Sequence, residues 1–287
     1  MVFIFMKSIK KHWRNILKFG LKLAFLKFIS SKLVKLGLVE DAEKLRQRLS
    51  AEINQRFDST IAYGSFKGFK FTKNSWWSKH DRGSMILGLY EKEIIEILLN
   101  TSKERSVFID IGAADGYYAV ASVKNYFFDR SYCFEIEQKG RSVIRQNSIL
   151  NGVAEKVIIF GEANRKSLLK IPKADISNSV VLIDIEGFEF DFLDTNILNI
   201  LKESVCIIEL HDWYFEDGKK RLEELRKRAS KKFQVSEFKL CSRDTSNIKE
   251  LDLYSDNERW IICSEGRPRS MTWLRLDPKA LQNELIS

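Results

Sequence analysis

Asp110, Gly112, Asp115 and Gly116 lie in one short turn whose residue types suit a cationic ligand. The turn reads DIGAADG and follows an apolar run at 107–111. Its glycines let the backbone approach a ligand, and a helix that begins here presents free amides to it. Gly112 and Gly116 are four residues apart, which departs from the G-x-G-x-x-G spacing of dinucleotide sites. Because the carboxylate of Asp110 suits an ammonium better than a pyrophosphate, the turn favours S-adenosylmethionine over NAD.

A second acidic position follows the next apolar run. Glu135 stands 23 residues after Gly112, and a carboxylate at about this distance accepts the hydroxyl protons of a ribose in nucleotide-binding folds. An exposed glutamate at a strand end is the alternative, and the coupling to the first turn favours the ribose contact. Glu162, after the third apolar run, is predicted as a further cofactor contact.

Acidic groups also follow the fourth and fifth apolar runs, which continue as DIEGFE from Asp184 and ELHDW from Glu209. Carboxylates this close repel one another unless a cation or protons intervene, and a divalent metal, a substrate cation or solvation are each left open. We predict Asp184, Glu209 and Asp212 as the metal ligands. His211 is predicted as the general base for an acceptor hydroxyl, with Asp184 and Glu186 beside it. A histidine that only hydrogen-bonds to the backbone is the alternative.

The apolar runs alternate with helical patterns, which predicts an α/β fold. Runs that are apolar on both faces and separated by helices are typical of a mostly parallel sheet with helices on both faces. The last two runs have no obvious helix between them, which indicates an antiparallel hairpin. Ligands of such sheets bind at the carboxyl ends of the strands, where the acidic residues lie. The seven predicted strands are 107–111, 131–136, 156–160, 179–185, 205–210, 235–240 and 260–264.

Excess positive charge is confined to the start of the chain. Residues 1–36 carry nine Lys or Arg and no acidic residue, which equals the net charge of +9, so the remainder is balanced. A neutral body argues against a nucleic-acid partner. Lysines interrupt the apolar residues too often for a membrane span or a signal peptide. The segment fits a basic helix on an anionic membrane surface or a helix packed on the protein, and both are left open.

The four cysteines have no C-x-x-C spacing, which indicates reduced thiols. We therefore expect a cytoplasmic chain, with peripheral contact with the inner face of the membrane left open.

Trp76 and Trp77 either stack on a ligand or pack a cap against the sheet. Helices are predicted over 39–60 and 84–100, and a hairpin over 63–72.

Three segments follow from these patterns. They are a basic amphipathic segment at 1–38, a helical and hairpin lead-in at 39–100 and a ligand-binding α/β domain at 101–287.

Four motifs resemble the FkbM-type methyltransferases, and the resemblance covers about residues 84–215. The motifs are FIDIGAADGYY at 108–118, FE at 134–135, NG at 151–152 and, most specifically, DIEGFE at 184–189. Ala114 and Ile136 depart from the family pattern.

The resemblance implies a Rossmann-like class I methyltransferase domain behind an N-terminal helical extension. It implies S-adenosylmethionine as cofactor, bound at Asp110, Gly112 and Glu135, and an acceptor-side role for Asp184 and Glu186. Members of the family often methylate hydroxyls of sugars in glycans, glycolipids or natural products. The sequence therefore predicts an O-methyltransferase for a sugar or glycan hydroxyl without a nucleic-acid partner, and leaves a divalent cation open as a second cofactor.

Rival functions come from other classes. A non-catalytic cofactor-binding scaffold at a membrane surface and a small-molecule methyltransferase are left open. An NAD-linked oxidoreductase is disfavoured by the glycine spacing. A nucleic-acid methyltransferase that acts on the adenine amino group would carry a [DNS]-P-P-[YFW] element where this chain reads DIEG from Asp184, which makes that alternative the weaker one.

Overall fold

The computed structural model describes residues 40–77, 79–267 and 269–279, together with Lys22, Phe25, Leu26, Ile29 and Lys32. The chain divides into two compact units, residues 1–46 and 47–287, and the second unit holds the sheet and the site. The predicted basic helix of residues 1–36 lies almost wholly outside the described residues. Within the described part of the chain, no helix is long and apolar enough to cross a membrane.

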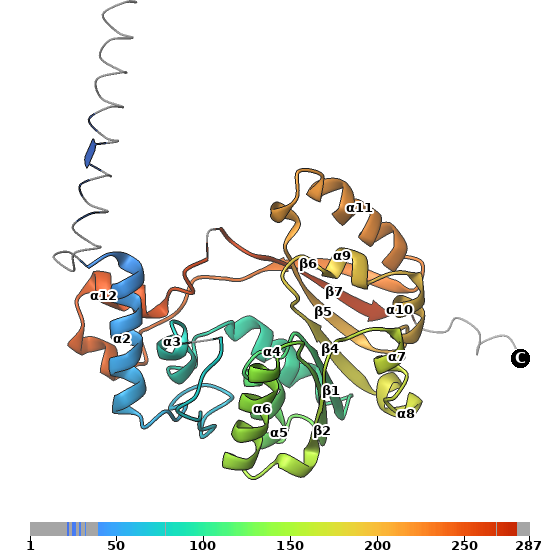
Figure 1. Ribbon diagram of the computed structural model, residues 1–287, viewed down its shortest axis with the longest axis horizontal. Coiled ribbons are helices and arrows are strands. Elements are labelled where there is room, and N and C mark those ends of the chain that lie inside the picture. Colours follow the sequence, from blue (N-terminus) through green and yellow to red (C-terminus); the bar gives the residue numbers. More distant parts are fainter. Residues whose placement is uncertain are drawn as a thin grey trace, which may run out of the picture. The chain divides into compact units, whose positions relative to one another are not determined.

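A seven-stranded sheet forms the centre of the second unit (Figure 1), and its strand order is β3-β2-β1-β4-β5-β7-β6. Neighbouring strands are parallel from β3 to β5, whereas β7 is antiparallel to both β5 and β6. The prediction of a seven-stranded, mostly parallel Rossmann-like sheet is confirmed. The strands are β1 (Val107–Ile111), β2 (Arg130–Phe134), β3 (Val157–Phe160), β4 (Ser179–Ile183), β5 (Val205–Leu210), β6 (Phe233–Lys239) and β7 (Thr272–Pro278).

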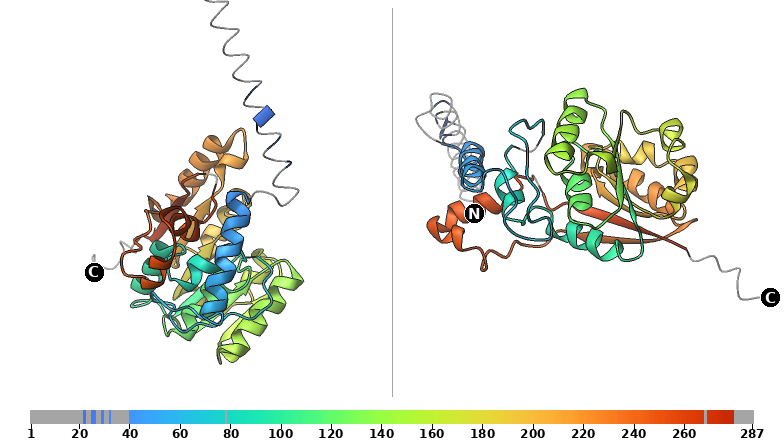
Figure 2. Two further views of the ribbon diagram at one scale, coloured as in Figure 1. Left: turned by 90° about the vertical axis from the view of Figure 1, so that its left-hand side faces the viewer. Right: turned by 90° about the horizontal axis from the view of Figure 1, so that it is seen from below.

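Helices cover both faces of this sheet, as Figures 1 and 2 show. One face carries α4 (Lys92–Thr101), α5 (Tyr117–Lys124) and α6 (Gln138–Leu150). The other face packs Ile109, Ile111 and Ile183 of the sheet into a buried apolar cluster with side chains of the later helices. Full burial of each such side chain stabilises the fold by about 1.5–3 kcal/mol. These later helices are α7 (Arg165–Leu168), α8 (Lys173–Ser177), α9 (Glu189–Phe192), α10 (Thr195–Ile200) and α11 (Gly218–Ala229).

The strand register determines which strand ends meet. Ile111 of β1 pairs with Ile183 of β4, and Ile183 pairs with Ile208 of β5. The direction in which strands are added reverses between β1 and β4, so the switch point of the sheet lies there. Residues just after these strands therefore share one edge, which is where open α/β sheets bind ligands.

The predicted strand at 260–264 is wrong, because this segment lies in a helix, α12 (Asp256–Cys263). A capping box starts the helix: Ser255 and Glu258 each accept a hydrogen bond from the other's backbone amide. Such caps stabilise helices by about 1 kcal/mol. The last strand is instead β7, and it does pair antiparallel with β6 as predicted. The two are not joined by a hairpin, since α12 and the 3-10 helix η3 (Lys249–Leu253) lie between them.

The lead-in also differs from its prediction. The single helix predicted over 84–100 is two helices, α3 (Arg82–Ile86) and α4, because Glu91 has a left-handed backbone with φ of 42°. The predicted hairpin is a series of turns with one bridge between Thr60 and Lys70. The charged helix predicted over 39–60 is present as α2 (Ala42–Arg56).

Candidate functional site

The turn after β1 is shaped by two glycines with left-handed backbones, Gly112 (φ 93°) and Gly116 (φ 76°). A Cβ on Gly112 would lie 1.8 Å from the carbonyl oxygen of Asp184, so only glycine lets β1 and β4 end this close together. The amides of Gly112 and Ala113 donate to the carbonyl of Phe134 at 2.9 and 3.0 Å. Gly116 precedes the first residue of α5. The turn thus joins the ends of three neighbouring strands to a helix N-terminus.

Asp110 is the residue before the last one of β1 and is 3% exposed. Its Oδ2 atom is buried and has no hydrogen-bond partner among the described residues. Burial, and then the charge of Asp184, raise the pKa of Asp110 to about 8. A buried carboxyl in this state is stabilised by a proton or by a cationic ligand, so Asp110 fits the ammonium of an amino acid.

Glu135 follows β2 and is 7% exposed. Its Oε2 accepts a hydrogen bond from the amide of Ala114 at 2.8 Å, and its Oε1 accepts one from the amide of Glu137 at 2.7 Å. A Cβ on Gly140 would lie 2.6 Å from Cγ of Glu135, so a glycine in α6 makes room for this side chain. Each carboxylate oxygen retains a lone pair. Glu135 is therefore fixed beside the β1 turn and can still accept hydroxyl protons.

Asp115, another predicted cofactor residue, contacts the lead-in instead. Its carboxylate accepts hydrogen bonds from the hydroxyl of Ser75 at 2.5 Å and from the amides of Trp76 and Trp77 at 2.9 and 3.3 Å. The guanidinium of Arg82 lies 3.6 Å away. Asp115 therefore ties the backbone of the two tryptophans to the β1 turn.

Glu162, the remaining predicted cofactor residue, lies after β3 and is exposed. Its carboxylate accepts a hydrogen bond from the side-chain amide of Asn164 at 3.4 Å, and its backbone carbonyl accepts one from the hydroxyl of Ser167 at 2.9 Å. No contact places it with Asp110 or Glu135 among the residues the structure describes.

On the acceptor side, the structure brings Asp184, Glu186 and His211 together. The Nε2 atom of His211 lies 3.9 Å from Oδ1 of Asp184 and 3.5 Å from Oε2 of Glu186. Backbone strain helps to place Glu186, whose φ is 53°, and the next residue, Gly187, whose φ is 102°. The hydroxyl of Tyr214 donates to Oε2 of Glu186 at 3.1 Å. One ligand atom from each of Asp184, Glu186 and His211 lies within 4.8 Å of the others, and we refer to these three residues as the acceptor cluster.

The fully buried carboxylate of Glu189 holds His211 in place through hydrogen bonds to the backbone. Its Oε1 accepts the amide proton of His211 at 2.7 Å, and its Oε2 accepts that of Gly187 at 2.8 Å. Oε1 also lies 3.5 Å from Nδ1 of His211. Burial on its own lowers the pKa of His211, but Glu189 and the charge of Asp184 outweigh it and leave the pKa above its ordinary value. Burial raises the pKa of Asp184 to about 6.

The predicted metal ligands Glu209 and Asp212 have other surroundings. Glu209 is 3.8 Å from Nε2 of His211 and forms an ion pair with Arg267. Asp212 begins the short 3-10 helix η2 (Asp212–Tyr214), and its carbonyl oxygen lies against Gly218. The compact group therefore contains Asp184 from the predicted set, with Glu186 and His211 in place of the other two.

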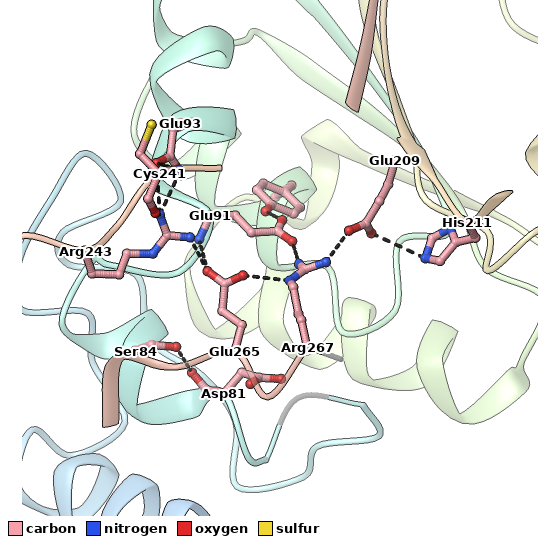
Figure 3. A network of polar contacts seen from close by, with 11 residues as sticks. Asp81, Ser84, Glu91, Glu93, Glu209, His211, Cys241, Arg243, Glu265 and Arg267 are labelled. Carbon is pink, nitrogen blue, oxygen red and sulfur yellow. Dashed lines mark hydrogen bonds and ion pairs between the residues drawn. The ribbon is translucent and has the colours of Figure 1, made fainter. Parts of the chain in front are cut away.

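A network of buried ion pairs connects Glu209 to the lead-in (Figure 3). Arg267 contacts Glu91 and Glu209, and its Nε lies 2.7 Å from Oε2 of Glu265. Arg243 continues the network to Glu265 and, at 2.8 Å, to Glu93. The two arginines lie in the connection between β6 and β7. No sequence pattern indicates their role, because their partners Glu91, Glu93 and Glu209 are far away in the chain.

Comparisons with known proteins find similar solved structures, whereas no family model and no curated protein matches the chain. The B. subtilis m1A22 tRNA methyltransferase TrmK is 13% identical with a TM-score of 0.39, over 63% of this chain and 65% of that one. M. capricolum TrmK in complex with S-adenosylhomocysteine is 16% identical with a TM-score of 0.40, over 64% and 68%. A precorrin-6y C5,15-methyltransferase from Geobacter metallireducens is 14% identical with a TM-score of 0.43, over 66% and 90%.

The prediction of a sugar acceptor without a nucleic-acid partner is contradicted by this comparison. One of the three enzymes is named for tRNA and another for a precorrin, and none is named for a sugar. The balanced charge of residues 37–287 is therefore no ground for excluding nucleic acid. At these identities and TM-scores, the functional argument rests on the geometry of the site.

Proposed function

We propose that this chain is an S-adenosylmethionine-dependent methyltransferase that methylates an acceptor hydroxyl at the carboxyl edge of its sheet. The observation that carries the proposal is the buried carboxyl of Asp110 next to the glycine turn, whose Oδ2 has no hydrogen-bond partner among the described residues. A dinucleotide would place a pyrophosphate at this turn, and the acidic side chain of Asp110 offers its negative charge no compensation. The amino-acid part of S-adenosylmethionine instead brings an ammonium.

The residues around the turn fit the other parts of this cofactor. Glu135 would accept the ribose hydroxyl protons on the free lone pairs of its oxygens. The amides at the start of α5, next to Gly116, would face the carboxylate of the amino acid. Trp76 and Trp77, fastened to Asp115, would cover the bound molecule. The motifs at 108–118 and 184–189 resemble the FkbM-type methyltransferases, and we propose membership of that family on this basis.

When bound, S-adenosylmethionine supplies a methyl group on a sulfonium: the S–CH3 bond breaks as an O–CH3 bond forms, and the hydroxyl proton leaves. The acceptor cluster lies after β4 and β5, beside the β1 turn. It would orient the acceptor oxygen and favour loss of its proton. Holding two reactants in line supplies about 7–11 kcal/mol of the barrier, which makes orientation the main task of the site.

Calorimetry with S-adenosylhomocysteine tests the cofactor assignment. We expect the wild-type chain to bind it and Glu135→Ala to weaken binding about 10- to 100-fold, since hydrogen bonds to a charged group contribute about 1.5–3 kcal/mol. Glu162→Ala removes a carboxylate of the same type from an exposed position and serves as the matched control, with unchanged affinity. The proposal is wrong if the wild-type chain gives no heat at millimolar ligand, or if the two variants lose affinity equally.

A further inference from the structure

We infer that the acceptor cluster (Asp184, Glu186 and His211) is a binding site for a divalent cation. The inference deepens the proposed function, because a cation held there would lie beside the methyl acceptor. It also stands on its own evidence, which is the geometry of the three side chains, the fixed orientation of His211 and the balance of charge around them.

The distances within the cluster are long for hydrogen bonds and short enough for ligands of one ion. Nε2 of His211 lies 3.5 Å from Glu186 and 3.9 Å from Asp184. Ligand atoms about 2.0–2.2 Å from a shared metal ion lie roughly 3.0–3.5 Å from one another. The three ligand atoms lie within 4.8 Å of one another, so side-chain movements of up to about 1.5 Å would close the site around a cation.

The imidazole of His211 is oriented as in metal sites. Its side chain is 4% exposed, and Nδ1 lies 3.5 Å from Oε1 of the buried Glu189, although Nδ1 has no hydrogen-bond partner among the described residues. A carboxylate behind one ring nitrogen directs the other nitrogen toward a metal and raises its basicity. Here that other nitrogen, Nε2, points into the acceptor cluster. Oδ1 of Asp184 is likewise buried and without a hydrogen-bond partner among the described residues.

Further carboxyl groups are crowded around the cluster. Asp110, Glu189 and Glu209 add carboxylates close to those of Asp184 and Glu186. Arg267 neutralises Glu209, but its guanidinium is shared with Glu91 and Glu265 (Figure 3). A protonated His211 would compensate for one further carboxylate. A divalent cation would compensate for two and relieve the repulsion between them.

The donor set indicates the class of cation. One imidazole nitrogen and two carboxylate oxygens suit Mn²⁺, Fe²⁺ or Zn²⁺ better than Ca²⁺, which takes oxygen ligands. Two of the three side chains are partly open to solvent, with Asp184 37% and Glu186 48% exposed. Remaining coordination positions are therefore accessible to water or to an acceptor hydroxyl, whose pKa a bound cation lowers.

Titration of the EDTA-treated full chain with Mn²⁺, followed by calorimetry and by the electron paramagnetic resonance signal of free Mn²⁺, tests the site. We expect one Mn²⁺ per chain, and at least tenfold weaker binding in Glu186→Gln and His211→Asn. Glu189 acts as a positioning residue, so Glu189→Gln should weaken Mn²⁺ binding about 10- to 100-fold. Asp212→Asn is the matched control, because the structure leaves this carboxylate outside the cluster; its Mn²⁺ affinity should not change.

S-adenosylhomocysteine affinity, measured on the same variants, separates a lost cation site from a lost fold. Glu186→Gln should retain that affinity while it loses Mn²⁺. Absence of Mn²⁺ binding to the wild-type chain at millimolar concentration, or an equal loss in Asp212→Asn, would overturn the inference and leave a protonated His211 as the compensating charge. Mn²⁺ binding without S-adenosylhomocysteine binding would instead support the cation site and contradict the proposed methyltransferase function.

Discussion

At the scale of single residues, we expect Asp110 to make the affinity for the proposed cofactor depend on pH. Its pKa of about 8 keeps the carboxyl mostly protonated at neutral pH, and it must lose that proton to pair with an ammonium. Raising the pH toward 8 therefore favours binding. We expect the Kd for S-adenosylhomocysteine to fall by up to about tenfold per pH unit between pH 6 and 7.5. The affinities should be measured in the presence of EDTA, because a cation bound to Asp184 would offset the negative charge that raises the pKa of Asp110.

Asp110→Asn supplies the comparison for this pH dependence. The amide cannot ionise, so the variant should bind S-adenosylhomocysteine more weakly than the wild type at pH 7.5 and with little change in affinity across the same range. Calorimetry at several pH values measures both chains. A wild-type affinity that is constant with pH would show that Asp110 does not meet the ammonium.

Gly112 is required by the close approach of two strand ends. An alanine there would place Cβ 1.8 Å from the carbonyl oxygen of Asp184, in a backbone with φ of 93°. We expect Gly112→Ala to lower the free energy of unfolding by more than about 3 kcal/mol, since clash and strain act together. Gly161→Ala, where a Cβ meets no atom within 4 Å, should change it by less than about 0.5 kcal/mol. Urea denaturation of both variants measures the difference, and equal losses would contradict the steric argument.

At the scale of elements, Arg267 joins the β6–β7 connection to β5 and to the start of α4. Its partners Glu91, Glu209 and Glu265 are 2%, 3% and 7% exposed. Removing the guanidinium takes the arginine partner away from the buried carboxylates of Glu91 and Glu209, whereas Glu265 keeps its ion pair with Arg243. We expect Arg267→Met to cost about 3–5 kcal/mol of the free energy of unfolding.

Arg259 offers the matched control for Arg267. It lies in α12 of the same connection and pairs with Asp256, which is 81% exposed. A surface pair of this kind contributes about 0–1 kcal/mol, so Arg259→Met should change the free energy of unfolding little. Denaturation curves of the two variants measure the difference in the free energy of unfolding. Similar losses in both variants would mean that the network in Figure 3 adds no stability.

The sequence predicts the elements that carry local patterns and misses those defined by distant contacts. β1 to β5 were predictable because each is a short apolar run, and β1 to β4 are directly followed by a glycine or an acidic residue. The run at 260–264 is equally apolar, but the capping box at Ser255 makes it helical. Glu91, Glu209 and Arg267 meet only after folding, so no spacing could have revealed them. The three residues of the acceptor cluster were predicted together, because they follow two neighbouring strands, whereas Glu209 and Asp212, which were predicted as metal ligands with Asp184, are not part of that compact group.

At the scale of the whole molecule, residues 47–287 form one compact unit that contains the sheet, the lead-in from Gln47 and both halves of the site. The proposed cofactor residues lie at the ends of β1 and β2, and the acceptor cluster follows β4 and β5. Binding at this edge therefore connects strands from both sides of the switch point. A ligand that binds only the folded state stabilises all of these elements together.

Thermal unfolding measures this linkage and separates the two cofactor classes. At about 100 times its Kd, a ligand of the folded state contributes about 2.7 kcal/mol, which for a domain of this size raises Tm by roughly 5–10 °C. We expect such a shift with S-adenosylhomocysteine and none with NADH, because the acidic side chain of Asp110 offers no compensating charge to a pyrophosphate at the β1 turn. Glu135→Ala should show a smaller increase in Tm at the same ligand concentration, because the stabilisation depends on the ratio of the ligand concentration to Kd and the Kd of this variant is higher. A Tm that responds to NADH alone would assign the turn to a dinucleotide and leave the carboxylate of Asp110 without a role in binding.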